Sequence, residues 1–345
     1  MIRFDSDYVE GAHEEILRRL AETNREQTVG YGEDPYCESA REKIRAACRA
    51  PGAAVHFLVG GTQANLTVIA SILRPHQGVL CAATGHINVH ETGAVEACGH
   101  KALGLPHKDG KITAAQVARA VEAHYADGAF EHIVQPGMVY ISQPTEFGTL
   151  YSLDELTALS ETCRRYGLPL YADGARLGYA LAAGDVTLPD LARLCDVFYI
   201  GGTKCGMLFG EAVVIAAPAL QKDFRYHIKQ RGGMLAKGRL LGIQFDTMFT
   251  DGLYGRVNAR AVEQAMRVRA AFLARGVEMY IDSPTNQQFP ALTRAQRDRL
   301  TRDFALTPWQ TLDDGREVTR VCTSWATAEE NLQKLLDAIA EMPGA

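Results

Sequence analysis

Two apolar runs stand near one another in the chain: Leu170-Tyr171-Ala172-Asp173-Gly174-Ala175-Arg176 and, after a polar interval, Asp196-Val197-Phe198-Tyr199-Ile200-Gly201-Gly202-Thr203-Lys204. Short apolar runs such as 168–172 and 197–200 are typical of buried parallel strands. The first run ends on an acid, and the second ends on a glycine turn and a lysine. Because open α/β sheets place their chemistry at the carboxyl ends of strands, we expect Asp173 and Lys204 at one edge of a sheet.

An acid and an amine at neighbouring strand ends suit one cofactor, pyridoxal phosphate. The lysine would form its Schiff base, and the aspartate would hold its pyridine nitrogen protonated, which makes the ring an electron sink. Each residue also has an ordinary explanation, since Asp173 before Gly174 can close a strand in an Asx turn and Lys204 can be a solvated loop lysine. The two residues together, in this order and on strand ends, favour the cofactor interpretation.

Strands and helices alternate around these two runs. Further strands are predicted at 55–59, 78–82, 102–106, 138–142 and 211–216. Ser152, with Glu155 three residues later, forms the capping-box signature of a helix over 153–166. The alternation predicts a mostly parallel, three-layer α/β domain.

The C-terminal part of the chain has a different pattern. A helical region is predicted from residue 240 to about 275, and after it strands at 277–281, 287–291 and 318–325 with helices at 294–304 and 328–342. We therefore expect a large cofactor-binding domain over residues 1–242, including the N-terminal segment, and a smaller α+β domain over residues 243–345.

A glycine turn follows the strand predicted at 55–59, with the sequence Gly60-Gly61-Thr62-Gln63-Ala64-Asn65 before a helical run. Backbone N–H groups at a helix N-terminus, together with a hydroxyl, suit a phosphate. The alternative is an ordinary β–α turn with Thr62 as the N-cap, and Gly-Gly-Thr by itself favours that alternative.

Two histidines and a glutamate, His86, His90 and Glu91, cluster after the strand predicted at 78–82. A zinc site is one interpretation, but the H-E-x-x-H pattern is absent. A stacking or proton-transfer role for one histidine suits the segment better, and an ordinary, partly buried histidine is the expectation for His90. We expect no metal site.

The composition, 345 residues with 47% hydrophobic and 22% charged side chains, is that of a globular protein with a large core. The net charge of −5 combines interspersed signs, and no basic stripe indicates nucleic acid. The apolar runs are too short to span a bilayer, and the N-terminus lacks the apolar core of a signal peptide. The eight cysteines include no C-x-x-C pair, which predicts free thiols in a reducing cytoplasm.

Taken together, these segments resemble the low-specificity L-threonine aldolases, which are pyridoxal 5′-phosphate enzymes of the aspartate aminotransferase fold, fold type I. The resemblance covers almost the whole chain. It is carried by short motifs in a shared order: Asp5-Ser6-Asp7, Tyr31-Gly32-Glu33-Asp34-Pro35, Gly61-Thr62-Gln63-Ala64-Asn65, Gly85-His86 with Glu91-Thr92-Gly93, Asp173-Gly174-Ala175-Arg176, Gly202-Thr203-Lys204 and Thr319-Arg320-Val321-Cys322-Thr323-Ser324-Trp325.

The resemblance implies a cofactor-binding role for several residues. Lys204 matches the Schiff-base lysine, and Asp173 matches the acid on the pyridine nitrogen. His86 matches the imidazole stacked on the ring, and Arg176 matches the arginine beside the phenolic oxygen. The phosphate cradle is matched by Gly61 and Thr62.

The resemblance also implies a substrate site. Ser6 and Arg320 match the groups that bind the substrate carboxylate, a task that suits a bidentate arginine. Tyr31 would come from a neighbouring subunit, because the family builds its sites at a dimer interface. A homodimer or homotetramer is therefore expected, with a small amino acid as the substrate.

Two departures from the family pattern stand out. Where some members carry a second histidine, after the strand that precedes the central one, this chain has Glu146. Many members have an arginine two residues after a glycine pair, reaching the phosphate, whereas Gly232-Gly233 is followed here by Met234 and Leu235. Lys237 is the candidate to carry the phosphate charge instead.

The activity implied is that of a carbon–carbon lyase that cleaves L-threonine, L-allo-threonine or phenylserine to glycine and an aldehyde. His86 is the candidate to take the β-hydroxyl proton, directly or through water. A β-eliminating lyase or a transaminase on the same scaffold is the alternative, since fold does not fix reaction. A non-catalytic binding protein is the alternative of a different class, and the retention of Lys204, Asp173 and Arg320 together argues against it.

Overall fold

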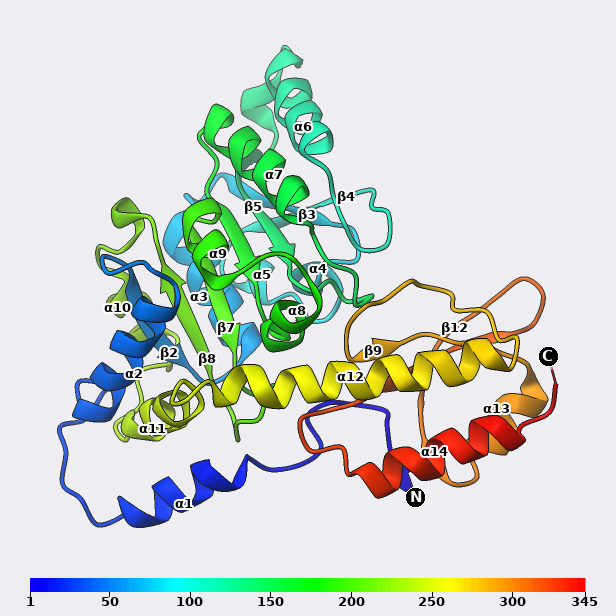
Figure 1. Cartoon of the computed structure of the whole chain (residues 1–345). Helices are drawn as coiled ribbons and strands as arrows, with labels where there is room; N and C mark the ends of the chain where they lie inside the picture. Colours follow the sequence, from blue (N-terminus) through cyan, green and yellow to red (C-terminus); the bar gives the residue numbers. More distant parts are fainter. Residues whose placement is uncertain (345) are drawn as a thin grey trace.

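The computed structural model describes residues 1–344 and contains a central sheet of seven strands in the order β2-β8-β7-β6-β5-β3-β4 (Figure 1). The strands are β2 (Ala54–Leu58), β3 (Gln77–Ala82), β4 (Lys101–Leu105), β5 (Gln135–Ser142), β6 (Leu170–Asp173), β7 (Val197–Gly201) and β8 (Glu211–Ile215). Only β8 runs antiparallel to its neighbours, β2 and β7, within this sheet. The predicted mostly parallel sheet is confirmed.

The two apolar runs that open the sequence argument are adjacent in the sheet. Strands β6 and β7 pair in parallel, with Tyr171 opposite Val197, and both are buried along their whole length. On the other side of β6, Ser142 at the end of β5 lies opposite Asp173. The carboxyl ends of three neighbouring strands therefore meet at one edge.

Helices cover both faces of the sheet. They are α1 (Glu14–Glu22), α2 (Pro35–Ala47), α3 (Gly61–Ile72), α4 (His86–Val89), α5 (Ala94–Ala97), α6 (Ala114–Ala126), α7 (Leu153–Tyr166), α8 (Leu177–Ala183), α9 (Leu188–Leu194), α10 (Phe224–Gln230), α11 (Arg239–Met248) and α12 (Leu253–Ala274). The capping box predicted at Ser152 and Glu155 begins α7.

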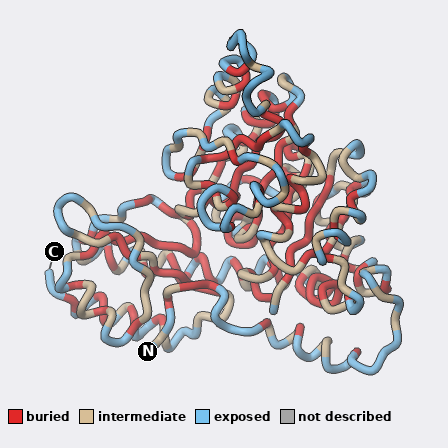
Figure 2. The backbone as a smooth tube through the Cα atoms, turned by 180° about the vertical axis from the view of Figure 1, so that it is seen from behind, coloured by how far each residue is buried: buried red, intermediate tan, exposed pale blue. Residues whose placement is uncertain are grey.

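Alternate strand residues point to opposite faces, and the core divides accordingly. Phe198 and Ile200 pack with α2, α6, α7, α8, α9 and α11 on one face. Val197 and Tyr199 pack with α3, α4, α5 and α10 on the other. The layers are thus helix, sheet and helix, and Figure 2 shows the buried residues gathered in the interior of the molecule.

The C-terminal part has its own core around Phe272, Leu300 and Leu335. Its elements are β9 (Gln287–Gln288), β10 (Ala291–Leu292), α13 (Arg294–Leu300), β11 (Phe304–Ala305), β12 (Thr307–Thr311), β13 (Glu317–Cys322) and α14 (Glu329–Glu341). The N-terminal β1 (Ile2–Arg3) pairs with β11, so the two ends of the chain share this unit.

Helix α12 joins the two cores, as the long yellow helix in Figure 1 shows. Its Ala261 and Val262 belong to the core of the sheet, whereas Val268 and Phe272 belong to the C-terminal core. The boundary expected between residues 242 and 243 falls inside α11, and the division into two domains stays a prediction.

Strand prediction was least accurate in the C-terminal part. The strand predicted at 277–281 is wrong, because only Met279 bridges, to Pro290. The strand predicted at 287–291 is split into β9 and β10 around Pro290, which has no N–H to donate to a ladder. Strand β12 was missed, since Thr307–Thr311 is only partly buried and contains Pro308. Among the described residues, no helix is both long and apolar enough to cross a membrane.

Candidate active site

Asp173 and Lys204 open onto one cavity of about 240 Å³ at the carboxyl edge of the sheet. The same cavity is lined by Gly61, Thr62, His86 and Arg176, which the sequence nominated, and by Glu146 and Glu211. A wider neighbouring cavity of about 580 Å³ is also lined by His86, Glu146, Arg176 and Lys204, and it adds Tyr8, His90, Trp309 and Arg320. The fold therefore brings most of the nominated residues together from segments far apart in the chain.

The Asp173 carboxylate is surrounded by hydrogen-bond donors. Its Oδ2 accepts from the Tyr140 hydroxyl at 2.7 Å and from the Asn65 amide at 2.9 Å. Its Oδ1 accepts from the Tyr199 hydroxyl and from the Ala175 N–H, the latter at 2.9 Å. These bonds hold the carboxylate in one orientation at the end of β6. The bond from the Ala175 N–H also closes the Asx-type turn that the sequence left as an alternative. Asp173 therefore forms this turn and lines the cavity at the same time.

Asn65 links Asp173 to His86 through Glu91. The Asn65 amide donates to Glu91 Oε1 at 2.7 Å as well as to Asp173, and the Tyr171 hydroxyl donates to its oxygen at 2.8 Å. The same Glu91 oxygen lies 2.7 Å from Nδ1 of His86. Burial alone would lower the pKa of His86, but the Glu91 hydrogen bond and the Asp173 charge raise it above the usual histidine value.

Lys204 lies three residues beyond β7, among charged groups. Burial and the Arg176 guanidinium lower the pKa of its amine below the usual lysine value. Arg176 is itself held by Asp7, with its Nε 2.6 Å from one carboxylate oxygen and its Nη2 2.9 Å from the other. A lowered pKa leaves more of the amine neutral, and only the neutral amine is a nucleophile.

Glu211, on β8, holds the backbone that leads to Lys204. Its two oxygens accept from the Gly202 N–H at 3.1 Å and from the Thr203 hydroxyl at 2.9 Å. Burial raises the pKa of Glu211 to about 8, although Thr203 and Lys204 act in the opposite direction. The Glu211 carboxyl therefore fixes the glycine turn from the neighbouring strand.

The glycine turn after β2 starts helix α3 directly. The helix begins at Gly61 with Gly60 as the N-cap, and no side chain caps it, so the alternative of Thr62 as an N-cap is wrong. Thr62 is exposed and lines the cavity of Lys204. A Cβ on Gly61 would lie 3.0 Å from the Tyr199 hydroxyl, which leaves little room for a larger residue. The open first turn of α3 therefore faces the cavity as an anion site would.

Ser6 and Arg320 come from opposite ends of the chain and meet at Asp5. Arg320 donates through Nη2 to the Asp5 carbonyl at 3.0 Å, and its guanidinium lies 5.7 Å from the centre of the Trp309 ring. The Ser6 hydroxyl and Arg320 Nε are both buried and have no hydrogen-bond partner within the described chain. Buried polar groups normally find partners. Arg320 lines the wider cavity and has capacity left for a ligand, whereas Ser6 lines neither cavity of Lys204.

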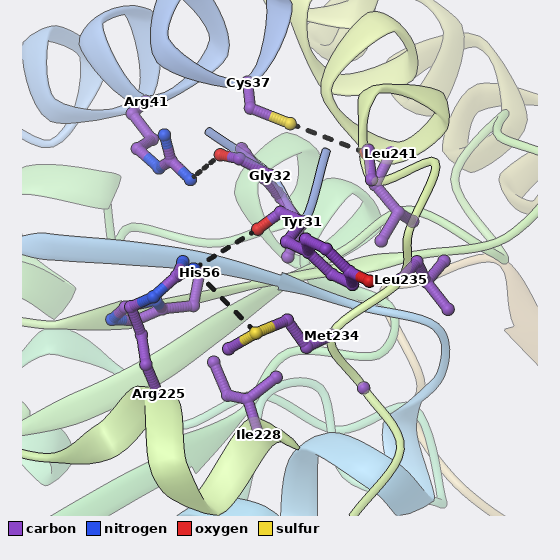
Figure 3. Close-up of a pocket in the computed structure, with 13 residues that line it drawn as sticks. Tyr31, Gly32, Cys37, Arg41, His56, Arg225, Ile228, Met234, Leu235 and Leu241 are labelled. Carbon is purple, nitrogen blue, oxygen red and sulfur yellow. Dashed lines mark hydrogen bonds between the residues drawn. The ribbon is translucent and has the colours of Figure 1, made fainter. Parts of the chain in front are cut away.

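Tyr31 and Lys237 lie outside the two cavities of Lys204 in this chain, and His90 is more exposed than expected. Tyr31 lines a separate small pocket with Arg225 and Met234, where Figure 3 shows it beside Leu235. Lys237 is exposed and lines neither cavity of Lys204. His90, expected as a partly buried histidine, is exposed and lines the wider cavity beside His86.

Several residues of the network were not assigned a role from the sequence. Tyr140 and Tyr199 are buried in the middle of apolar strands, and buried tyrosine hydroxyls need a partner. That pattern, one tyrosine on each of the two strands that flank the acid-terminated strand, could have predicted the donors to Asp173. Asn65, Glu91 and Asp7 lay inside quoted motifs, but only the tertiary contacts assign their partners. Within residues 1–344, no group of three or more His, Cys, Asp and Glu side chains could hold a metal ion.

Comparison with known proteins agrees with this geometry. The family described as β-eliminating lyase matches residues 3–300. A low-specificity L-threonine aldolase from a Pseudomonas strain is 31% identical, and the alignment covers 96% of this chain and 95% of the relative. The solved structure of a threonine aldolase from Leishmania major is 42% identical, covers 99% of both chains and superposes with a TM-score of 0.95.

An aspartate aminotransferase from Thermus thermophilus superposes with a TM-score of 0.70 at 14% identity, covering 99% of this chain and 91% of that one. At such low identity the likeness shows the fold alone. With the mostly parallel sheet between helical layers, it confirms the predicted α/β class and fold type I.

Proposed function

The chain belongs to the β-eliminating lyase family and, within it, to the low-specificity L-threonine aldolases, and we propose that it cleaves β-hydroxy-α-amino acids to glycine and an aldehyde with pyridoxal 5′-phosphate. L-Threonine, L-allo-threonine and phenylserine are the proposed substrates. The observation that carries the proposal is the pairing of a partly buried lysine and a buried aspartate on one cavity of this fold.

The residues around the cavity suit this cofactor. The open first turn of α3, with Gly61 and Thr62, suits a phosphate, and the Asp173 carboxylate suits a protonated ring nitrogen. The Lys204 amine is suited to bond to the aldehyde carbon of the cofactor, and the Arg176 guanidinium is suited to donate to its phenolic oxygen. When bound, the cofactor supplies an electron sink for the bond that breaks at the substrate Cα.

The side chains then have distinct tasks. With the cofactor bound, Asp173 would keep the ring nitrogen protonated, and His86, whose Nδ1 is held by Glu91, would stack on the ring. Arg320 and Ser6 bind the substrate carboxylate, which orients Cα–Cβ toward the electron sink. Two side chains that line both cavities, His86 and Glu146, are the candidates to accept the β-hydroxyl proton. Lys204 would supply the amine that holds the cofactor.

We further propose that the enzyme works in the cytoplasm as a homodimer or homotetramer. Tyr31 is half exposed and lies away from Lys204 in its own chain, which is compatible with a role at a neighbour's site. Lys237, exposed beyond the Tyr31 pocket, would supply phosphate charge in the same way, from the neighbour.

Product analysis tests the proposed reaction. The purified protein should absorb visible light through the bound cofactor and should convert phenylserine to glycine and benzaldehyde in equal amounts. Keto acid and ammonia without glycine would instead favour the β-eliminating reaction that the family description raises. Colourless protein with no cofactor binding would defeat both.

A further inference from the structure

Glu146 is an acid that neither the cofactor nor the carboxylate clamp uses. It follows β5 and lines both the cavity of Lys204 and the wider cavity that contains Arg320. The residue thus lies where the two spaces meet, together with His86, Arg176 and Lys204.

The two oxygens of the Glu146 carboxylate have different surroundings. Oε1 accepts from the Ser142 hydroxyl at 2.7 Å and from the His86 backbone N–H at 3.0 Å. Within the described part of the chain, no other residue donates a hydrogen bond to Oε2, and Oε2 is not among the buried atoms without a partner. One oxygen is therefore fixed, and the other is open to the cavity.

His86 is less free to take a proton than its position suggests. Its Nδ1 is already bound to Glu91, and its pKa is raised despite burial, by the Glu91 hydrogen bond and by Asp173. Nε2 is then the one ring nitrogen left to accept a proton. Glu146 is partly buried, and burial raises its pKa, which makes its carboxylate a stronger base than that of an exposed glutamate.

We propose that Glu146 is the residue that takes the β-hydroxyl proton of the substrate, an inference that rests on the proposed aldolase function. The O–H bond breaks toward Glu146 Oε2, and the oxygen electron pair forms the aldehyde C=O as the Cα–Cβ bond breaks. The electron pair of that bond stays with Cα. One proton leaves the hydroxyl and one is added at Cα, so glycine and aldehyde form without an oxidant or reductant.

Glu146→Gln separates this role from a structural one. The amide oxygen can still accept from Ser142 and from the His86 N–H, but the group facing the cavity becomes an NH₂ that cannot take a proton. The holoenzyme should keep its cofactor absorbance. It should also exchange the α-protons of glycine with deuterated water at the wild-type rate, since glycine has no β-hydroxyl.

Aldehyde release from phenylserine should fall in Glu146→Gln by about 10²–10⁴-fold in kcat, with KM little changed. Glu161→Gln, the same change at an exposed glutamate of α7, is the matched control and should behave as wild type. His86→Asn should slow cleavage and glycine exchange together, because its ring lies against the cofactor in both reactions.

Two results would overturn the assignment. Aldehyde release by Glu146→Gln within about threefold of wild type would show that no proton passes to this residue. Loss of absorbance and of glycine exchange along with cleavage would make Glu146 a structural residue of the site. Failure of the proposed function would appear in the wild-type enzyme, as keto acid formed without glycine. Failure of the Glu146 assignment would appear only in the variants.

Discussion

The Asp173 side and the Arg320 side of the site satisfy their polar groups to different degrees. Asp173 accepts hydrogen bonds from Tyr140, Asn65, Tyr199 and the Ala175 N–H. On the other side, the Ser6 hydroxyl and Arg320 Nε are buried without a partner. An unpaired buried polar group costs about 1–3 kcal/mol, and a ligand that binds at the wider cavity can offset this cost for Arg320. We infer that the saturated side serves a resident cofactor and the unsaturated side serves a substrate that comes and goes.

Replacement of Lys204 should have the largest effect, because its amine lines both cavities and is the proposed attachment point of the cofactor. Lys204→Ala should show no measurable aldehyde release and should lose the visible absorbance of the bound cofactor. Lys222→Ala, at an exposed lysine, is the matched control and should retain both. If Lys204→Ala still released aldehyde and kept the visible absorbance of the cofactor, the lysine would have no role in the reaction.

The saturated side is tested by Asp173→Asn. The amide occupies the same space, but it has no negative charge to hold a ring nitrogen protonated. Its NH₂ group also donates hydrogen bonds, whereas the groups around residue 173 need an acceptor. We expect kcat to fall by about 10²-fold or more and the cofactor to bind more weakly. Titration of cofactor-free protein with pyridoxal phosphate, followed by absorbance, measures the second effect. Near-wild-type values would make Asp173 no more than a turn residue.

The same contrast explains what could be predicted from the sequence. Asp173 and Lys204 were predictable because strand ends are encoded locally, by apolar runs that stop at a polar residue. The partner of Asn65 was not predictable, since its amide reaches an acid 108 positions away, and that contact exists only in the folded sheet. The pairing of β1 with β11 was missed for the same reason. In the C-terminal unit, short strands interrupted by Pro290 and Pro308 carry too little periodicity to be placed.

The unsaturated side is tested by Arg320→Leu. Loss of a charge-assisted bond to a carboxylate costs about 1.5–3 kcal/mol, or roughly 10- to 150-fold in kcat/KM, mainly through KM. Absorbance of the bound cofactor should be unchanged, because Arg320 lines the wider cavity and not that of about 240 Å³. Weak cofactor binding in this variant would contradict the division of the site into two sides. Unchanged KM and kcat would remove Arg320 from substrate binding.

The smallest expected effect concerns Glu211, which accepts hydrogen bonds from Gly202 and Thr203, the two residues before Lys204. Its carboxyl titrates near 4.5 when exposed, and burial raises the pKa to about 8 in the folded chain. Between these values the folded state binds more protons than the unfolded state, so stability falls as pH rises. The contribution is complete below about pH 4.5 and is lost as the pH passes through about 8.

Glu211→Gln removes this titration and keeps an oxygen that can accept from the Gly202 N–H. The free energy of unfolding of the cofactor-free variant should therefore decline less than that of wild type between pH 5 and pH 8. Urea unfolding at a fixed protein concentration and several pH values measures the difference. Parallel pH profiles for the two proteins would mean that Glu211 is ionised in the folded chain and paired with the Lys204 ammonium. The lysine would then be protonated before the cofactor binds, and the saturated side would include an ion pair in place of a neutral amine.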